Sequence, residues 1–225
     1  MSTIKAVLFD FDETLHDRMQ AFDGYVADFL AHFCPGISAA EKEKRAADMV
    51  RYCGGGYTQG RDYYEKLGKL WHWADRPPAE TCITYYNRNF PKYCSVFPEA
   101  KTLFARLKEL GYTVGVVTNG PSELQHGKLE GSGLMPWCDF LVVSGDVGIH
   151  KPDPRIFLYT AEKYGLDPAA CVYVGDHPVN DMETALKAGM HAIRMNVGWF
   201  KDQGLRDDVP NITSILQVLD VLKNG

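Results

Sequence analysis

Residues 6–14 read AVLFDFDET, and this short stretch decides what the rest of the sequence can build. It begins with four apolar residues, a pattern typical of a strand that is buried on both faces of a parallel sheet. The apolar run stops at Asp10, and a second carboxylate follows at Asp12. We therefore predict a central strand over residues 6–9, with polar chemistry where that strand ends.

Residues 17–94 follow the periodicity of helices instead. Apolar side chains recur at helical spacing over residues 22–33. Ser38 and Glu41 then have the spacing of a capping box for a second helix. That helix ends at the three glycines of residues 54–56, and two further helical patterns follow. The segment is predicted to form an all-helical domain.

From residue 96 onward, helical and strand patterns alternate. We predict strands over residues 113–117, 140–143, 172–176 and 192–195, the last of these being the final strand of the sheet. Strands separated by helix-length connections form a parallel, doubly wound sheet with helices on both faces. The expected fold is therefore α/β. A core domain of residues 1–16 and 95–225 is interrupted by a helical insertion of residues 17–94.

Composition narrows the classes of function. The 225 residues are 45% hydrophobic and carry a net charge of −5, so the overall charge supplies no basic field that would hold a nucleic-acid backbone. The six cysteines show no CxxC spacing, which argues against a zinc site or a disulfide framework. We find neither a signal peptide nor an apolar run long enough to span a membrane. These features predict a cytoplasmic protein with no membrane partner, either a monomer or a homodimer.

Polar side chains gather where the predicted strands end. They are Asp10 with Asp12, Thr118 with Asn119, Lys151, and Asp176 with Asp181. The carboxyl ends of parallel strands lie side by side, so these groups should share one pocket. Clustered carboxylates repel one another and require a cation, and hard oxygen ligands suit Mg²⁺. An Asp carboxylate beside Mg²⁺ points to phosphoryl transfer.

The same residues resemble the four motifs of the haloacid dehalogenase-like (HAD) hydrolases. The signature DxDxT corresponds to residues 10–14, and Thr118, Lys151 and Gly175-Asp176 with Asp181 correspond to the other three motifs. The resemblance implies a Rossmann-like catalytic core and a helical cap domain over residues 17–94. Details of the second and third motifs resemble the 5′-nucleotidase and acylneuraminate-phosphatase branch, and the helical insertion resembles the cap of phosphoglycolate phosphatases.

The resemblance also implies roles for individual residues. Asp10 corresponds to the nucleophile, and Asp12 corresponds to the acid/base that protonates the leaving oxygen and then activates water. Thr118, the backbone of Asn119 and Lys151 correspond to the groups that bind the phosphoryl oxygens. The implied substrate is a small phosphorylated metabolite.

A magnesium site is implied in the same way. Asp10, the backbone carbonyl of Asp12 and Asp176 correspond to the ligands of Mg²⁺. Asp181 corresponds to a residue that acts on the metal through water or through its ligands.

Three other functions share parts of this pattern. A haloacid dehalogenase needs no second carboxylate, so Asp12 argues against that activity. A phosphomutase shares every core motif and stays open as an alternative. A phospho-accepting signalling or binding protein without turnover is the alternative from a different class.

Overall fold

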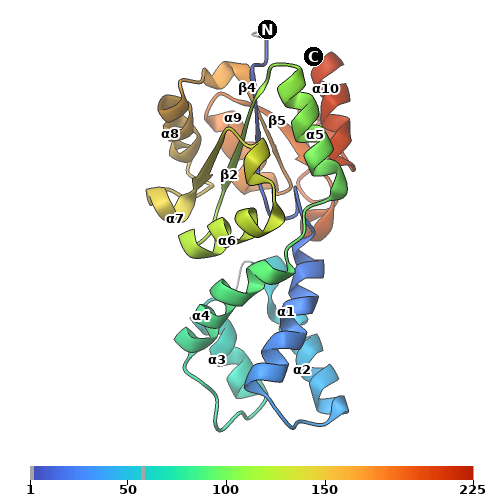
Figure 1. The fold of residues 1–225 in the computed structure, drawn as a ribbon, viewed down its shortest axis with the longest axis vertical. Helices are drawn as coiled ribbons and strands as arrows, with labels where there is room; N and C mark the ends of the chain where they lie inside the picture. Colours follow the sequence, from blue (N-terminus) through green and yellow to red (C-terminus); the bar gives the residue numbers. More distant parts are fainter. Residues whose placement is uncertain (1–2, 57–58, 225) are drawn as a thin grey trace. The chain divides into compact units, whose positions relative to one another are not determined.

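The protein, as a computed structural model, is described over residues 3–56 and 59–224, and the chain forms two compact units (Figure 1). The core unit comprises Met1–Asp17 and Ser95–Gly225, and the helical unit comprises Arg18–Cys94. The predicted boundary after residue 16 therefore differs from the structural division by one residue. Each unit is described separately below.

The core unit is built on one sheet of six parallel strands in the order β3-β2-β1-β4-β5-β6. The strands are β1 (Ala6–Phe9), β2 (Thr113–Thr118), β3 (Phe140–Val143), β4 (Cys171–Gly175), β5 (His191–Met195) and β6 (Asn211–Ile212). The first strand lies in the interior of the sheet, where Phe9 is in register with Val116 of β2 and Val174 of β4. The doubly wound fold predicted from the sequence is confirmed.

The strand order creates a switch point between β1 and β4. From β1 the chain moves outward through β2 and β3, and it then returns to the other side of β1 to form β4. Neighbouring connections diverge at such a point and leave a crevice at the carboxyl ends of the two strands. The segments that follow β1 and β4 therefore both lie beside this crevice.

Helices cover both faces of the sheet (Figure 1). The helices of the core unit are α5 (Pro98–Glu109), α6 (Ser122–Ser132), α7 (Ser144–Val147), α8 (Arg155–Tyr164), α9 (Thr184–Lys187) and α10 (Val218–Asn224). Helices α5, α6 and α10 contribute to one hydrophobic core, whereas α8 and α9 contribute to the other. Along β1, Val7 and Phe9 belong to the first core and Ala6 and Leu8 to the second, which explains its unbroken apolar run.

One detail of the sheet differs from the sequence-based expectation. The predicted final strand is not the last one, because β6 pairs with β5 through Met195 and Ile212. A strand of two residues is too short to show an alternating pattern. Between β4 and β5 the chain forms a π-helical turn, η5 (Pro178–Glu183), which continues into α9.

The helical unit consists of α1 (Arg18–Phe33), α2 (Ala39–Tyr52), α3 (Arg61–Leu70) and α4 (Ala79–Asn89), with short turns between them. Ser38 caps α2 by accepting a hydrogen bond from the backbone N–H of Glu41 at 3.2 Å. Aromatic rings fill the interior, where the ring centre of Tyr25 lies 5.1 Å from that of Tyr86 and 6.0 Å from that of Phe90. The described residues of this unit form helices and turns and contain no strand.

The glycines of residues 54–56 make room for an arginine. All three have positive φ, and a Cβ on Gly56 would lie 2.4 Å from the guanidinium carbon of Arg18. Arg18 is buried at the start of α1. Glycine is favoured at residue 56 because other residues rarely adopt its φ of 90°, and because an added side chain would also meet the guanidinium.

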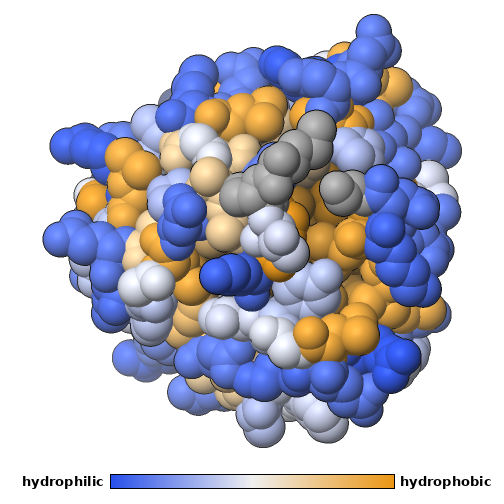
Figure 2. Space-filling model, turned by 90° about the horizontal axis from the view of Figure 1, so that it is seen from above, coloured by the Kyte–Doolittle hydropathy of each residue, from blue (hydrophilic) through white to orange (hydrophobic). Residues whose placement is uncertain are grey.

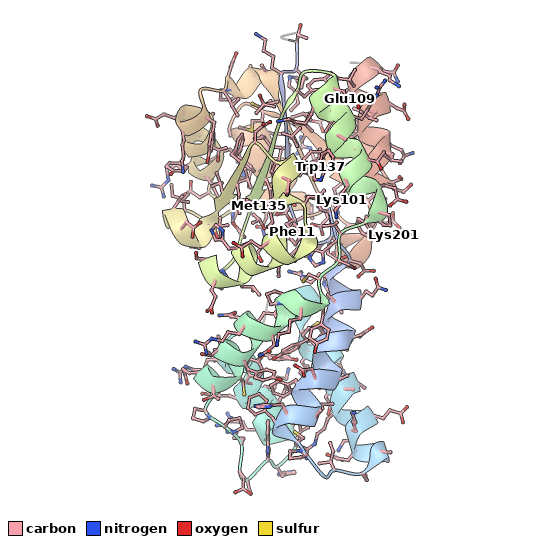
Figure 3. All side chains as sticks on the ribbon, in the orientation of Figure 1. Phe11, Lys101, Glu109, Met135, Trp137 and Lys201 are labelled. Atoms are coloured by element: carbon pink, nitrogen blue, oxygen red, sulfur yellow. The ribbon has the colours of Figure 1, made fainter. Side chains whose placement is uncertain are left out.

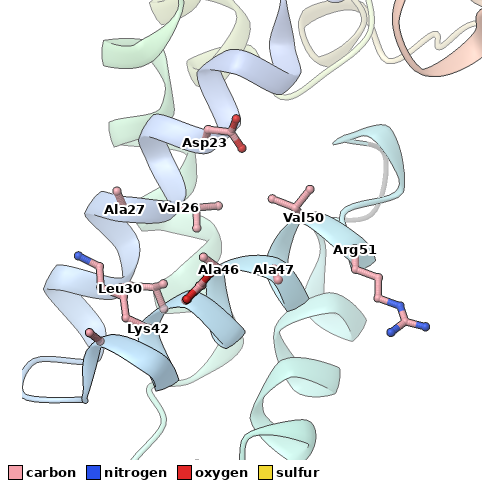
Figure 4. A pocket seen from close by; sticks show the side chains of 11 residues that line it. Asp23, Val26, Ala27, Leu30, Lys42, Ala46, Ala47, Val50 and Arg51 are labelled. Atoms are coloured by element: carbon pink, nitrogen blue, oxygen red, sulfur yellow. The ribbon is translucent and has the colours of Figure 1, made fainter.

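A groove of about 730 Å³ runs between α1 and α2 (Figure 4). Val26 and Leu30 of α1 face Val50 of α2 across it, and Asp23 and Arg51 lie at its margin. The groove therefore combines an apolar floor with charged edges of both signs.

A smaller pocket of about 330 Å³ lies at the amino ends of the strands in the core unit. It is lined by Ile4, Tyr112 and His191 among other residues. Figure 2 shows hydrophobic and hydrophilic residues interspersed on that end of the molecule. In the described ranges, no helix has both the length and the apolar character needed to cross a bilayer.

Gly115 of β2 allows a close contact that we use to test the packing of the core unit. A Cβ at this position would lie 2.2 Å from the ring of Phe140, which stacks on Tyr164 at 3.9 Å. We expect Gly115→Ala to destabilise the protein by about 1–3 kcal/mol, because the overpacked ring must shift. Urea unfolding would measure the change. Gly115→Ala should destabilise the protein less when Phe140→Leu is also present, because the clashing ring is then absent. Additive losses of unfolding free energy in the double variant would contradict this packing.

Candidate active site

The turn after β1 places two carboxylates in different surroundings. The backbone N–H of Asp10 still donates to Val174 of β4 at 2.8 Å, so this residue continues the sheet. The chain then turns, because the N–H of Leu15 donates to the carbonyl of Phe11 at 2.9 Å. Phe11 is fully buried and is labelled in Figure 3. The side chains of Asp10 and Asp12 consequently meet different partners.

Lys151 is the central partner of Asp10. Its ammonium donates to Asp10 Oδ1 at 2.8 Å, to Asp181 Oδ1 at 2.7 Å and to the hydroxyl of Tyr173 at 2.7 Å. Tyr173 in turn donates to the carbonyl of Val117 at 2.7 Å. The side chain of Lys151 is only 2% exposed, so three acceptors satisfy a buried cation.

Burial and charge act in opposite directions at this ion pair. Burial alone would lower the pKa of Lys151, but the carboxylates of Asp10 and Asp181 outweigh it and hold that pKa above its ordinary value. Burial raises the pKa of Asp10 to about 6 against the opposing effect of Lys151, and the charges of Asp181 and Asp12 act in the same direction as burial. The lysine therefore stays charged, and additional positive charge beside Asp10 would lower the pKa of its carboxyl group.

The position of Lys151 is fixed through its backbone. Asn119 donates from Nδ2 to the carbonyl of Lys151 at 2.8 Å, and the N–H of Lys151 donates to Asn119 Oδ1 at 2.9 Å. These two bonds tie the end of β2 to the loop that carries the lysine. The side chain of Asn119 thus orients Lys151, which leaves only the backbone of Asn119 for the phosphate-binding role predicted from the sequence.

Asp10, Asp176 and Asp181 form an acidic cluster. Each offers a carboxylate oxygen, and these oxygens lie within 4.8 Å of one another. Asp176 and Asp181 are each 1% exposed. A buried set of carboxylate oxygens fits a small divalent cation, because the cation offsets their repulsion.

Gly175 and η5 bring Asp181 into this cluster. A Cβ on Gly175 would lie 2.5 Å from Asp181 Oδ2, so only glycine lets the carboxylate approach the strand so closely. The N–H of His177 donates to the same oxygen at 2.9 Å. Asp181 Oδ1 already accepts from Lys151, and this residue therefore links the lysine to the acidic cluster.

Arg194 adds a second buried cation near the cluster. It lies on β5, is 1% exposed, and interacts electrostatically with Asp176 and Asp181. Burial lowers the pKa of Arg194, and the two carboxylates oppose that effect. Its guanidinium donates to the carbonyl of Phe200 at 2.9 Å, which holds the loop after β5 against the site.

Asp12 is surrounded by a separate set of donors. His16 Nε2 lies 2.7 Å from Asp12 Oδ1, and Lys128 Nζ lies 2.9 Å from Oδ1 and 3.0 Å from Oδ2. Gln125 Nε2 donates to Thr118 Oγ1 at 2.6 Å and contacts Asp12 Oδ2 at 3.3 Å. A carboxylate held in this way is positioned on both of its oxygens.

The structure brings all seven residues proposed from the sequence into one part of the core unit. It also adds residues that the sequence analysis missed: His16, Gln125, Lys128, Tyr173 and Arg194. Helix α6 carried a signal that could have found two of them. Its inward face presents Gln125 and Lys128 beside Leu124 and Leu129, at positions where apolar residues are expected.

Comparison with known proteins shows which family the chain resembles in sequence and in fold. A family model described as haloacid dehalogenase-like hydrolase matches residues 4–189. The chain is 30% identical to glyceraldehyde 3-phosphate phosphatase of Methanopyrus kandleri, over 98% of this chain and 97% of the relative. It is 29% identical to pyrimidine 5′-nucleotidase YjjG of Escherichia coli, over 84% of this chain and 85% of the relative.

A solved structure gives the same result. The HAD phosphatase from Thermococcus onnurineus shares 30% identity and a TM-score of 0.65, and the match covers 97% of this chain and 98% of that one. The match covers nearly the whole length of both chains and therefore includes the core unit and the helical unit alike. The chain belongs to the haloacid dehalogenase-like hydrolase family.

Proposed function

We propose that the protein is a Mg²⁺-dependent phosphomonoester hydrolase that acts on a small phosphorylated metabolite through an aspartyl-phosphate at Asp10. The observation that carries the proposal is the separation of two neighbouring carboxylates. Asp10 pairs with Lys151 beside the acidic cluster, whereas Asp12 is held by His16 and Lys128. Two titratable groups in different environments are suited to separate roles as nucleophile and proton carrier.

In the first step, a carboxylate oxygen of Asp10 attacks phosphorus, and the bond between phosphorus and the ester oxygen breaks. Asp12 supplies the proton that the leaving oxygen needs, so an alcohol departs. In the second step, Asp12 takes a proton from water, and the resulting hydroxide oxygen attacks phosphorus. The bond between phosphorus and Asp10 breaks, which releases inorganic phosphate and restores the carboxylate.

The ammonium of Lys151 and the hydroxyl of Thr118 are suited to bind the phosphoryl oxygens during both steps. Lys151 already contacts Asp10 at 2.8 Å, so a phosphoryl group joined to Asp10 would lie within its reach. Positive charge placed in advance at this position stabilises the transition state. Named relatives that are phosphatases or a nucleotidase support a phosphate ester as substrate.

Asp10, the backbone carbonyl of Asp12 and Asp176 would hold Mg²⁺. The ion, when bound, neutralises charge on the carboxylates and on the phosphoryl oxygens. Asp181 would help to position these ligands, because it accepts hydrogen bonds from both Lys151 and the N–H of His177. The chemistry of the donors, all oxygens, favours Mg²⁺ over softer metals.

The decisive experiment compares Asp10→Asn with Asp12→Asn. With p-nitrophenyl phosphate, whose leaving group needs no proton, Asp12→Asn should form the aspartyl-phosphate and then stall, since no base activates water. Asp10→Asn should form no adduct. Mass spectrometry of acid-quenched protein distinguishes the two, and an adduct on any residue other than Asp10 would overturn the mechanism.

The metal site predicts a response to Mg²⁺. Turnover should stop in excess chelator, and saturation at about 100 times Kd should stabilise the folded protein by about 2.7 kcal/mol in thermal unfolding. Asp176→Asn should lose both responses. Asp208→Asn is the control, because Asp208 is exposed and pairs with Arg206. Full turnover without divalent metal would contradict the assignment.

Lys151→Met should affect both activity and stability. We expect kcat to fall by about 10²- to 10³-fold, as for the loss of a single transition-state donor. Two buried carboxylates would also lose their cation, which should cost about 3–5 kcal/mol in urea unfolding. Lys187→Met is the matched control, since Lys187 is 59% exposed and pairs with Glu183 at 3.1 Å. If the two variants behaved alike, Lys151 would have no special role.

A further inference from the structure

Lys128 is a buried lysine outside the residues to which the proposed mechanism gives a role. It lies on the inward face of α6 with a side chain only 2% exposed. Burying an ammonium costs several kcal/mol unless it is paired and hydrogen-bonded. Its contacts with both oxygens of Asp12, at 2.9 Å and 3.0 Å, supply that pairing. The helix therefore places a cation at one particular carboxylate.

Two further side chains, those of His16 and Gln125, also contact the carboxyl group of Asp12. His16 reaches Oδ1 from the same turn, where an isolated β-bridge joins Asp12 to His16. The imidazole is held by packing, since its ring lies 4.6 Å from the ring of Phe11 and is fully buried. Gln125, one turn before Lys128 on α6, lies near Oδ2 and also donates to Thr118. These donors come from the turn after β1 and from α6.

We infer that Lys128, together with His16, is a positioning residue that holds the carboxyl group of Asp12 in the orientation needed for proton transfer to and from the substrate. This inference rests on the proposed function and adds to it a role for α6. Proton transfer is efficient only when donor and acceptor are within hydrogen-bond reach and well aligned. Contacts with both oxygens restrict the rotation of the Asp12 carboxyl group away from the leaving oxygen.

The role separates Lys128 from Lys151 in a measurable way. Lys151 lies beside the nucleophile, so its loss should slow every substrate. A defect in positioning Asp12 should instead be most severe when the leaving oxygen depends on receiving a proton. The sensitivity of kcat/KM to leaving-group pKa therefore reports on Lys128, because kcat/KM covers the reaction up to release of the leaving group.

The test uses a series of substituted phenyl phosphates, from p-nitrophenyl phosphate to unsubstituted phenyl phosphate, with Mg²⁺ and the 225-residue chain. In Lys128→Met, kcat/KM should fall at least about tenfold more for phenyl phosphate than for p-nitrophenyl phosphate, within the range of general acid catalysis. Lys128→Arg keeps a donor and a charge, and it should restore the wild-type dependence to within about threefold. Lys187→Met should match the wild type.

His16→Phe provides a second variant, because it keeps a ring against Phe11 and removes the donor to Asp12. It should steepen the dependence in the same direction, and it keeps the inference testable if Lys128→Met does not fold. An equal loss for all substrates in either folded variant would mean a merely structural role and would overturn the inference. If the wild type hydrolysed no member of the series, the proposed function would fail along with it. Normal wild-type turnover with unchanged slopes would remove only the role of Lys128 and His16.

Discussion

The ammonium of Lys151, buried among Asp10, Asp181 and Tyr173, is the interaction on which the rest of the core unit depends. A lysine can be buried only if nearly all of its donors find acceptors, and two of those acceptors are carboxylates that could not be buried without it. The lysine therefore offsets the cost of burying the two carboxylates, and the carboxylates offset the cost of burying the lysine. The acceptors come from the end of β1, from β4 and from η5, so the register of the sheet and the π-helical turn must both be right.

The strand order makes that convergence possible. Because β1 lies between β2 and β4, the loops after those strands reach the same crevice from both sides. Small residues then decide how closely the groups approach. Gly175 lets Asp181 lie against the strand, and the reciprocal hydrogen bonds of Asn119 hold the backbone of Lys151. The site is thus a consequence of sheet topology, adjusted by one glycine and one amide.

Much of this architecture could be predicted from the sequence. A strand that is covered on both faces consists entirely of apolar residues, so a run such as residues 6–9 predicts a buried strand. The carboxylates that follow the run indicate where the strand ends. What escaped prediction depends on contacts between distant residues. Tyr173 is hidden in the middle of a strand pattern, and its role arises only from its contact with Lys151. Asp12 and Lys128 are 116 residues apart, so nothing local links them.

The two lysines give different surroundings to two carboxylates that are only two positions apart in the sequence. In a continuing strand, residues i and i+2 point to the same face and would share their surroundings. Here the turn after Asp10 separates them, and Glu13 takes up a positive φ of 59° within that turn. Asp10 then meets the lysine of one loop, whereas Asp12 meets the lysine of a helix.

Separate lysines also suit the proposed reaction. The carboxylate of Asp10 would lose its charge when it forms an ester with phosphate, and Lys151 could then turn to the phosphoryl oxygens. Asp12 would exchange a proton twice in each cycle and must keep one orientation throughout. A single shared lysine would couple these two changes of charge, because moving it toward the phosphoryl group would release the proton carrier. Because Asp12 is held by Lys128 of α6, its orientation does not depend on the change of charge at Asp10.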